Sequence, residues 1–245
     1  MRRRQFLARL WAKLVAFERA HRLLAPGDRI LAAVSGGPDS VCLAHYLACL
    51  GRRRRFALLL LHVHHGLRGA EADRDAACVE RLGKTLGAPV EVVRVRTARR
   101  ARARGKGLED ASRELRYKAL EAAARRLKCN KVATGHQMDD QAETVLLHLL
   151  RGTRLKALAA IPPRRRLAPA IALIRPLLAL KRSEVLAYLK VCGLRSRLDR
   201  SNLSLRFTRN WLRRRILPAL EERQPRIREH LAGIAAQVRE VSPQS

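Results

Sequence analysis

The sequence has no pair of cysteines in a C-x-x-C arrangement. Its cysteines are odd in number and stand far apart along the chain, at Cys42, Cys49, Cys78, Cys129 and Cys192. This spacing argues against a disulfide framework, a zinc knuckle and a cysteine-held iron–sulfur cluster, and it favours a reducing compartment, so we expect a cytoplasmic protein. The sequence also lacks an apolar run long enough to span a bilayer, so we expect no membrane association.

Acidic side chains are scarce as well. The 245 residues include 21 Asp and Glu against 52 Lys and Arg, which gives a formal charge of +31. A field of this sign attracts polyanions, and arginine is suited to bidentate contact with phosphate. A host proteome biased towards arginine would produce part of the same excess, so the charge by itself leaves the partner open.

The first 24 residues are basic and amphipathic, as a mitochondrial transit peptide would be. Apolar side chains recur there at helical spacing, at Phe6, Leu7, Leu10, Leu14 and Phe17. This spacing favours a first structural helix, although a targeting role stays open.

An apolar segment at residues 30–34 leads into a small polar turn and then into an amphipathic helix. The turn reads Ser35, Gly36, Gly37, Pro38, Asp39 and Ser40. Glycines without a Cβ let backbone N–H groups converge on an anion, and the start of a helix favours negative charge. Proline suits the first helical position. We therefore expect a phosphate-binding turn, with an ordinary strand-to-helix connection as the alternative.

Strand-like and helix-like segments alternate along most of the chain. Strands are expected at residues 29–34, 56–61, 90–95, 131–134 and 171–174, with helices between them. This alternation predicts right-handed crossovers and an α/β fold with a Rossmann-like, doubly wound parallel sheet. The Pro-Pro-Arg-Arg-Arg run at 162–166 interrupts the rhythm, and short helices are expected at 182–192, 209–217 and 227–241.

Other candidate functional groups follow the strands. Asp139 and Asp140 begin a helix, where Asp140 with Glu143 could serve only as a capping box, or where the carboxylates could hold Mg²⁺ or a substrate ammonium. His62 and His64 share one face of a strand end, which favours packing or nucleotide contact over metal ligation. The basic run at 97–107 is either a solvated face or a nucleic-acid contact.

The turn resembles the PP-loop, S-G-G-x-D-S, of ATP pyrophosphatases. Further blocks resemble, in order, the motifs of one family within that superfamily, the tRNA(Ile)-lysidine synthetases. They lie at residues 62–68, 107–117, 135–147, 150–152, 175–178, 199–202 and 209–218. The last block, R-N-x-x-R before I-L-P, separates this family from other PP-loop enzymes, and the resemblance covers about residues 29–218.

The resemblance implies an adenine nucleotide alpha hydrolase-like fold and a ligase that forms a carbon–nitrogen bond. ATP would adenylate the C2 oxygen of the wobble cytidine in tRNA(Ile) with a CAU anticodon, and the ε-amine of free L-lysine would then displace AMP to give lysidine. The implied ATP-binding residues are those of the turn with His62, Gly135 and His136; the implied catalytic residues are Asp39, Arg113 and Asp139. Arg209 and Arg213 would bind tRNA, and Asp39, Asp139 and Asp140 would hold Mg²⁺.

The chain departs from the family in two ways. Gln137 stands where a second histidine is frequent, and the expected catalytic domain, residues 1–218, is followed only by a short basic helical segment, 219–245, in place of a full C-terminal tRNA-binding domain. The alternatives are a related PP-loop enzyme that thiolates tRNA, and an RNA-binding module without catalysis. The sequence leaves open the oligomeric state, a homodimer included, the residues that contact lysine and the number of Mg²⁺ sites.

Overall fold

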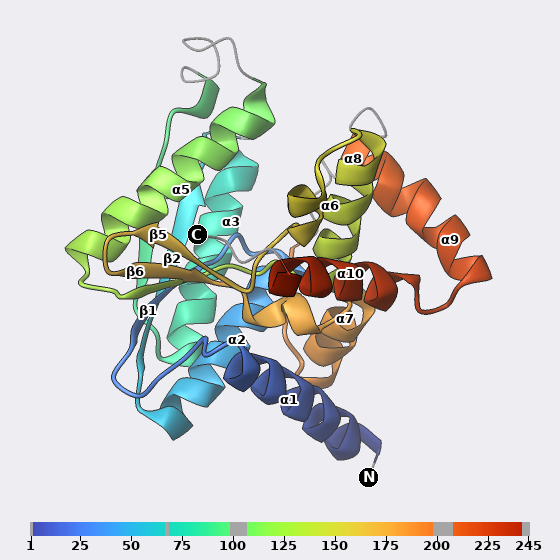
Figure 1. The fold of residues 1–245 in the computed structure, drawn as a ribbon. Coiled ribbons are helices and arrows are strands. Elements are labelled where there is room, and N and C mark those ends of the chain that lie inside the picture. Colours follow the sequence, from blue (N-terminus) through green and yellow to red (C-terminus); the bar gives the residue numbers. More distant parts are fainter. Residues whose placement is uncertain (1, 67–68, 99–106, 198–207, 242–245) are drawn as a thin grey trace.

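A six-stranded sheet forms the centre of the computed structural model, which describes residues 2–66, 69–98, 107–197 and 208–241 (Figure 1). The strand order is β3-β2-β1-β4-β6-β5, and every neighbouring pair is parallel except β5 and β6. The strands are β1 (Arg29–Ala33), β2 (Ala57–His64), β3 (Val90–Arg94), β4 (Lys131–Ala133), β5 (Arg164–Ala168) and β6 (Ile171–Ile174). The expected α/β class with a parallel, doubly wound sheet is confirmed.

Helices cover both faces of this sheet because alternate side chains of the buried strands point to opposite faces. On one face, Ile30 and Leu60 pack with α1, α2 and α3, and on the other Leu31 and Leu61 pack with α5. Figure 1 shows these helices around the sheet. The helices are α1 (Arg2–Ala20), α2 (Pro38–Arg54), α3 (Ala70–Leu86), α5 (Leu108–Arg126), α6 (Met138–Leu150), α7 (Arg182–Val191), α8 (Thr208–Trp211), α9 (Leu217–Arg223) and α10 (Ile227–Val241). Short 3₁₀ turns lie at η1 (Leu155–Ala159) and η2 (Pro176–Ala179).

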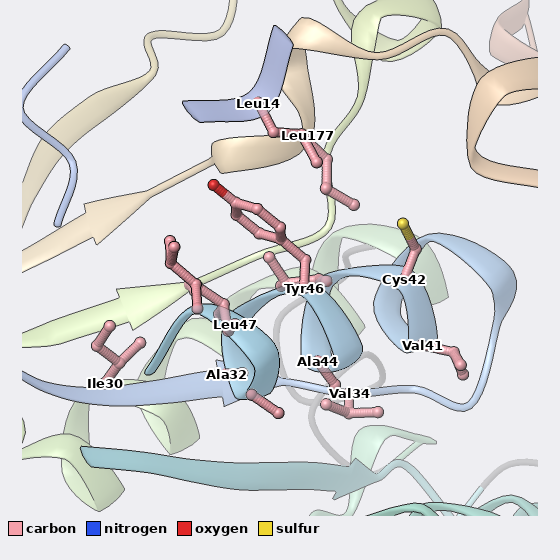
Figure 2. Close-up of a cluster of buried hydrophobic side chains, with 14 of the residues drawn as sticks. Leu14, Ile30, Ala32, Val34, Val41, Cys42, Ala44, Tyr46, Leu47 and Leu177 are labelled. Carbon is pink, nitrogen blue, oxygen red and sulfur yellow. The ribbon is translucent and has the colours of Figure 1, made fainter. Parts of the chain in front are cut away.

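The helix that follows the glycine turn is held in the centre of the larger core. Figure 2 shows Tyr46 and Leu47 of α2 above Ile30 and Ala32 of β1, with Leu14 of α1 on the far side. Tyr46, Leu47, Leu14 and Ile30 are all fully buried. Burying an apolar side chain of this size stabilises the fold by about 1.5–3 kcal/mol. The start of α2 is therefore fixed by its own packing and does not depend on a ligand.

One edge of the sheet differs from the sequence expectation. Residues 164–168, which follow two prolines and begin with three arginines, form the antiparallel strand β5, where no strand was expected. A polar run can occupy an edge strand because one side of the strand faces solvent. The expected helix at 209–217 is interrupted by a π-helical turn, Leu212–Ile216, just before Pro218, whose ring nitrogen has no N–H to donate.

The C-terminal helix α10 packs against α6, the helix that begins at the acidic pair. Leu231 and Ala235 of α10 meet Ala142 and Val145 of α6 in a separate apolar cluster. The expected basic run at 97–107 and the motif at 199–202 lie largely or wholly outside the described residues. Among the helices that are described, none is both long and apolar enough to cross a membrane.

Candidate nucleotide-binding site

The candidate site lies at the carboxyl ends of β1 and β4. The chain leaves β1 towards β2 and β3 on one side, whereas β4 and β6 lie on the other side. This reversal is the topological switch point, at which open α/β sheets bind ligands. The glycine turn follows β1, and the segment with Gly135, His136 and Asp139 follows β4, so two sequence motifs 100 residues apart meet here.

The turn at residues 35–40 is held open by its own hydroxyl groups. Ser40 Oγ donates to the Gly37 carbonyl at 2.8 Å and accepts from the Ser35 N–H at 3.2 Å. Gly36 has φ +85°, a conformation that side chains with a Cβ rarely adopt. The N-terminus of α2 begins at Pro38 and has no side-chain cap. Its dipole and free N–H groups are thus available to an anion such as a phosphate.

Two further contacts fix the position of the turn. The N–H of Arg197 donates to the Gly36 carbonyl at 2.9 Å, and the Arg197 guanidinium pairs with Asp75 of α3. From the other side, a Cβ on Gly135 would lie 3.1 Å from the Asp39 carbonyl oxygen, which shows how closely the two strand-end segments approach. A side chain at position 135 would therefore require the two segments to shift apart by a few tenths of an ångström.

Asp39 has an unused acceptor. Its Oδ2 lies 3.4 Å from Arg182 Nη1, but its Oδ1 is buried and has no hydrogen-bond partner. Burial raises the pKa of Asp39 to about 6, with Arg182 opposing the rise and Asp140 adding to it. A buried, unpaired carboxylate oxygen beside a phosphate-binding turn is suited to a cation that arrives with the phosphate.

Asp139 is held by two arginines that are distant in sequence. Its Oδ1 accepts from Arg228 Nη1 of α10 at 2.6 Å, and its Oδ2 accepts from the Arg182 backbone N–H at 2.9 Å. Arg228 also pairs with Glu221 of α9 at 3.0 Å. The C-terminal helices therefore reach into the site, which the sequence did not indicate.

Asp140 and Glu143 bind a third arginine. Arg213 donates to both oxygens of Glu143, from Nε at 2.6 Å and from Nη2 at 3.0 Å, and its Nη2 lies 3.3 Å from Asp140 Oδ1. Glu143 is fully buried, and burial raises its pKa to about 7 although Arg213 opposes the rise. Arg209 contacts Thr144 Oγ1 at 3.1 Å. Arg209 and Arg213, the expected tRNA contacts, thus lie over α6, with Arg213 turned towards carboxylates.

The expected capping box lies one turn earlier than predicted. Gln137 is the N-cap of α6: its side chain accepts from the Asp139 N–H at 2.6 Å, and Asp140 Oδ2 accepts from the Gln137 N–H at 3.0 Å. The alternative in which Asp140 forms a capping box with Glu143 is wrong, because Asp140 is the third residue of the helix and Glu143 binds Arg213 instead. Gln137 is completely buried and caps α6. Glutamine at this position, where the family often has a histidine, therefore still allows the helix to start here.

The two histidines differ in their positions. His62 Nδ1 donates to the Val34 carbonyl at 2.9 Å, so this ring supports the strand end before the turn. His136 Nδ1 lies 3.0 Å from Thr134 Oγ1. Burial, followed by the charges of Arg175 and other arginines that include Arg113, lowers the pKa of His136 to about 3, so the ring is neutral at physiological pH. Arg113 of α5 is exposed, and its charge reaches His136 at the end of β4.

A tyrosine beside this site is surrounded by guanidinium groups. The Cζ atoms of Arg113 and Arg165 lie 5.4 Å and 5.3 Å from the centre of the Tyr117 ring, which is cation–π range. Arg175, 3% exposed, donates from Nη1 to the Pro162 carbonyl at 2.6 Å, and its charge lowers the pKa of Tyr117. These residues come from α5, β5 and the end of β6.

The carboxylates Asp39, Asp139 and Asp140 meet at one end of the sheet, as the sequence predicted, but they do not form a ready metal cluster. Within the described ranges, no three His, Cys, Asp or Glu side chains are grouped to hold a metal ion. Asp139 and Asp140 are already paired with arginines, and of the oxygens of these three carboxylates only Asp39 Oδ1 is a buried atom without a hydrogen-bond partner in the described part of the chain. Mg²⁺ in nucleotide sites often takes one or two carboxylates and completes its shell with phosphates and water, so one open oxygen fits such an ion.

Two important residues of this site, Arg182 and Arg228, had no clear sequence signal. They stand among 52 basic residues, and nothing in their spacing sets them apart. Their roles arise from the way α7 and α10 return to the switch point. Arg175 differs, because it lies in the Arg-Pro-Leu-Leu block at residues 175–178 that resembles a family motif.

The chain is similar to curated proteins with one shared name. It is 46% identical over 203 residues to the tRNA(Ile)-lysidine synthase of Symbiobacterium thermophilum, covering 83% of this chain and 42% of that protein. It is 42% identical over 217 residues to the enzyme of the same name from Dehalococcoides mccartyi, covering 87% of this chain and 46% of that protein. The chain thus spans less than half the length of the curated relatives it matches.

A solved structure shares the fold. The U34-tRNA thiolase NcsA from Methanococcus maripaludis, determined with its [4Fe-4S] cluster, superposes with a TM-score of 0.79 and 19% identity, over 99% of this chain and 82% of that one. The sequence also matches the PP-loop domain family over residues 10–220, a range that contains the glycine turn, the acidic pair and the arginines that hold it, apart from Arg228. By this match over most of its length, the chain belongs to the PP-loop domain family.

Proposed function

We propose that this protein modifies a transfer RNA by joining lysine to the wobble cytidine of tRNA(Ile) with a CAU anticodon, as an ATP-dependent ligase that forms a carbon–nitrogen bond. The observation that carries the proposal is the open carboxylate oxygen of Asp39 beside an uncapped helix N-terminus at the switch point. Similarity to lysidine synthases over more than four fifths of this chain supports the choice of reaction.

The reaction has two balanced steps. The C2 oxygen of the cytidine attacks the α-phosphate of ATP, an O–P bond forms, and pyrophosphate leaves. The ε-amine of lysine then attacks C2, a C–N bond forms, the C2–O bond breaks with release of AMP, and the amine loses a proton. Both steps move negative charge onto phosphate groups, which preorganised N–H groups and cations stabilise.

The turn would bind the departing pyrophosphate. The backbone N–H groups at the start of α2 provide donors at fixed positions, because Ser40 and the packing of α2 hold the turn without a ligand. Those of Ser35 and Gly37 already donate to hydroxyl oxygens, and Pro38 has none. Mg²⁺, when bound through Asp39 and the phosphates, would offset the charge of the triphosphate. Arg113 would stabilise the adenylate from the side of β4.

The other carboxylates of the site, Asp139 in particular, would bind the ε-amine of lysine. Asp139 now holds the guanidinium of Arg228 at 2.6 Å, so its surroundings already accommodate a cationic nitrogen. Arg209 and Arg213 lie over α6, and we assign them to tRNA phosphates. Arg209, with about a third of its side chain exposed, is more accessible than Arg213, which pairs with Glu143. A cytoplasmic location agrees with five free cysteines.

Incubation with ATP, labelled lysine and total tRNA tests the proposal. Lysine should enter tRNA, and pyrophosphate should be released in equal amount. Asp39→Ala should abolish pyrophosphate release and leave tRNA binding largely intact. Release of pyrophosphate without transfer of lysine would refute the proposal in favour of thiolation or another acceptor, and wild-type turnover by Asp39→Ala would refute the site assignment.

A further inference from the structure

The arginines around Tyr117 differ from the other arginines at this end of the sheet. Arg182, Arg213 and Arg228 each bind a carboxylate within 3.4 Å. The hydrogen bonds described for Arg165 and Arg175 instead end on the carbonyl oxygens of Arg166 and Pro162. Among the residues that the structure describes, no ion pair joins Arg165 or Arg175 to a carboxylate, unlike the arginines around the acidic pair.

The electrostatic effects within the cluster point to the same conclusion. Burial by itself raises the pKa of Tyr117, but the charges of Arg113, Arg175 and Arg165 outweigh it, and the pKa lies below its usual range. Burial lowers the pKa of Arg175, Tyr117 opposes this, and Arg165 and Arg113 lower it further. Arg175 Nε is buried and has no hydrogen-bond partner. Binding of an anion would reduce the repulsion between these like charges and would give the unused donor a partner.

We propose that Arg165, held on the ring of Tyr117 and beside the buried Arg175, binds a phosphodiester of the RNA substrate at a position separate from the turn that binds ATP. This inference rests on the proposed function for the identity of the RNA. Guanidinium groups match phosphate geometry bidentately. The Tyr117 ring holds Arg113 and Arg165 through its π-face, so the groups are oriented before the ligand arrives.

The position of the cluster favours an RNA phosphate over a phosphate of ATP. β4 and β6 separate β1 from β5. Neighbouring strands lie about 4.8 Å apart, so Arg165 stands about 14 Å along the sheet from the strand that ends in the phosphate turn. An RNA backbone that reaches the switch point extends over this distance, whereas phosphates held at the turn do not. Arg165 and Tyr117 would thus fix the RNA strand beside the reacting nucleotide.

The edge strand offers a matched control for this site. Arg165 contacts Tyr117, whereas the neighbouring Arg166 is exposed and, by strand alternation, points to the other face. Arg165→Gln and Arg166→Gln each remove one positive charge from the same strand, so they change the general electrostatic field almost equally. Tyr117→Phe keeps the ring that holds the arginines, and Tyr117→Leu removes it.

The experiment measures binding of a fluorescent RNA stem-loop with a CAU anticodon, by anisotropy over a range of salt concentrations, for the full chain. Arg165→Gln should weaken binding roughly tenfold and make the slope of log K against log salt shallower by about 0.7 to 1. Arg166→Gln should weaken it at most about twofold. Tyr117→Phe should bind nearly as the parent does, and Tyr117→Leu should resemble Arg165→Gln.

Equal effects of Arg165→Gln and Arg166→Gln would overturn the site, since they would show only the general field. Loss of ATP affinity with unchanged RNA affinity in Arg165→Gln would also overturn it and would identify the phosphate as that of the nucleotide. Because binding is measured without lysine, the outcome is independent of the reaction. A protein that transfers no lysine yet shows the Arg165 effect would refute the proposed function and leave this inference standing.

Discussion

Replacing Asp39 by asparagine should stabilise the protein while it removes the proposed activity. Asparagine keeps the shape of the side chain and removes its charge. An ionised carboxyl whose pKa is about 6 in the folded protein, against an ordinary 3.8, costs the folded state about 3 kcal/mol. A quarter of the side chain is exposed and the Arg182 contact is lost, so a net gain of about 2 kcal/mol is expected.

The sign of this effect depends on pH in a way that can be measured. Because the folded pKa is raised, the wild-type protein loses stability as pH rises from about 4 to about 6, and the loss is complete above that. The asparagine variant lacks this dependence. The two proteins should therefore differ little near pH 4, and at pH 8 the variant should melt about 4–8 °C higher.

Urea and thermal unfolding of both proteins between pH 4 and 8, without nucleotide, provide the assay. Magnesium and ATP should protect the wild type far more than the variant, because the negative charge of the carboxylate that would hold the cation is gone. A variant that is less stable than the wild type at pH 8, or a gap that does not change with pH, would refute the assignment of Asp39 as a destabilised binding carboxylate.

Three other changes test separate parts of the structure. Arg228→Gln should lower the free energy of unfolding by about 3 kcal/mol by leaving Asp139 without its partner, and combination with Asp139→Asn should be far less than additive; additive losses in a urea double-mutant cycle would contradict this pair. Gly135→Ala should reduce pyrophosphate release in a turnover assay with little change in melting temperature, because its Cβ would lie 3.1 Å from the backbone at the start of α2; unchanged turnover would show that the contact relaxes freely. Gly83→Ala should lower the melting temperature by several degrees and leave RNA binding unchanged, since its Cβ would overlap Val90 at 2.1 Å. Weakened RNA binding at temperatures where the variant is folded would contradict a purely structural role for Gly83.

The parts of the site that the sequence predicted are those with local rules. The turn at residues 35–40 needs glycine at φ +85° and a helix start, and both leave a signal within a few residues. The alternation of strands and helices likewise predicts the sheet, and with it the meeting of Asp39 and Asp139 at one end. These features depend on backbone conformation and periodicity, which short segments determine.

The parts that the sequence did not predict depend on tertiary contact. β5 is an edge strand, where arginines are tolerated, and its run of polar residues resembles that of a solvated loop. Arg228 binds Asp139 only because α10 folds back onto α6, and the residues are 89 apart in the chain. The capping box begins at Gln137 because the chain leaving β4 places this residue at the start of α6. The helix propensities of Asp140 and Glu143 do not specify that position.

Mass analysis of the wobble nucleoside most directly tests the central claim that this PP-loop site joins lysine to cytidine. Purified tRNA(Ile) with a CAU anticodon would be incubated with the protein, ATP, Mg²⁺ and lysine, then digested to nucleosides. The account predicts a cytidine heavier by one lysine less one water, formed only when all components are present and absent with Asp39→Asn. An unmodified cytidine, or one in which sulfur replaces oxygen, would contradict it.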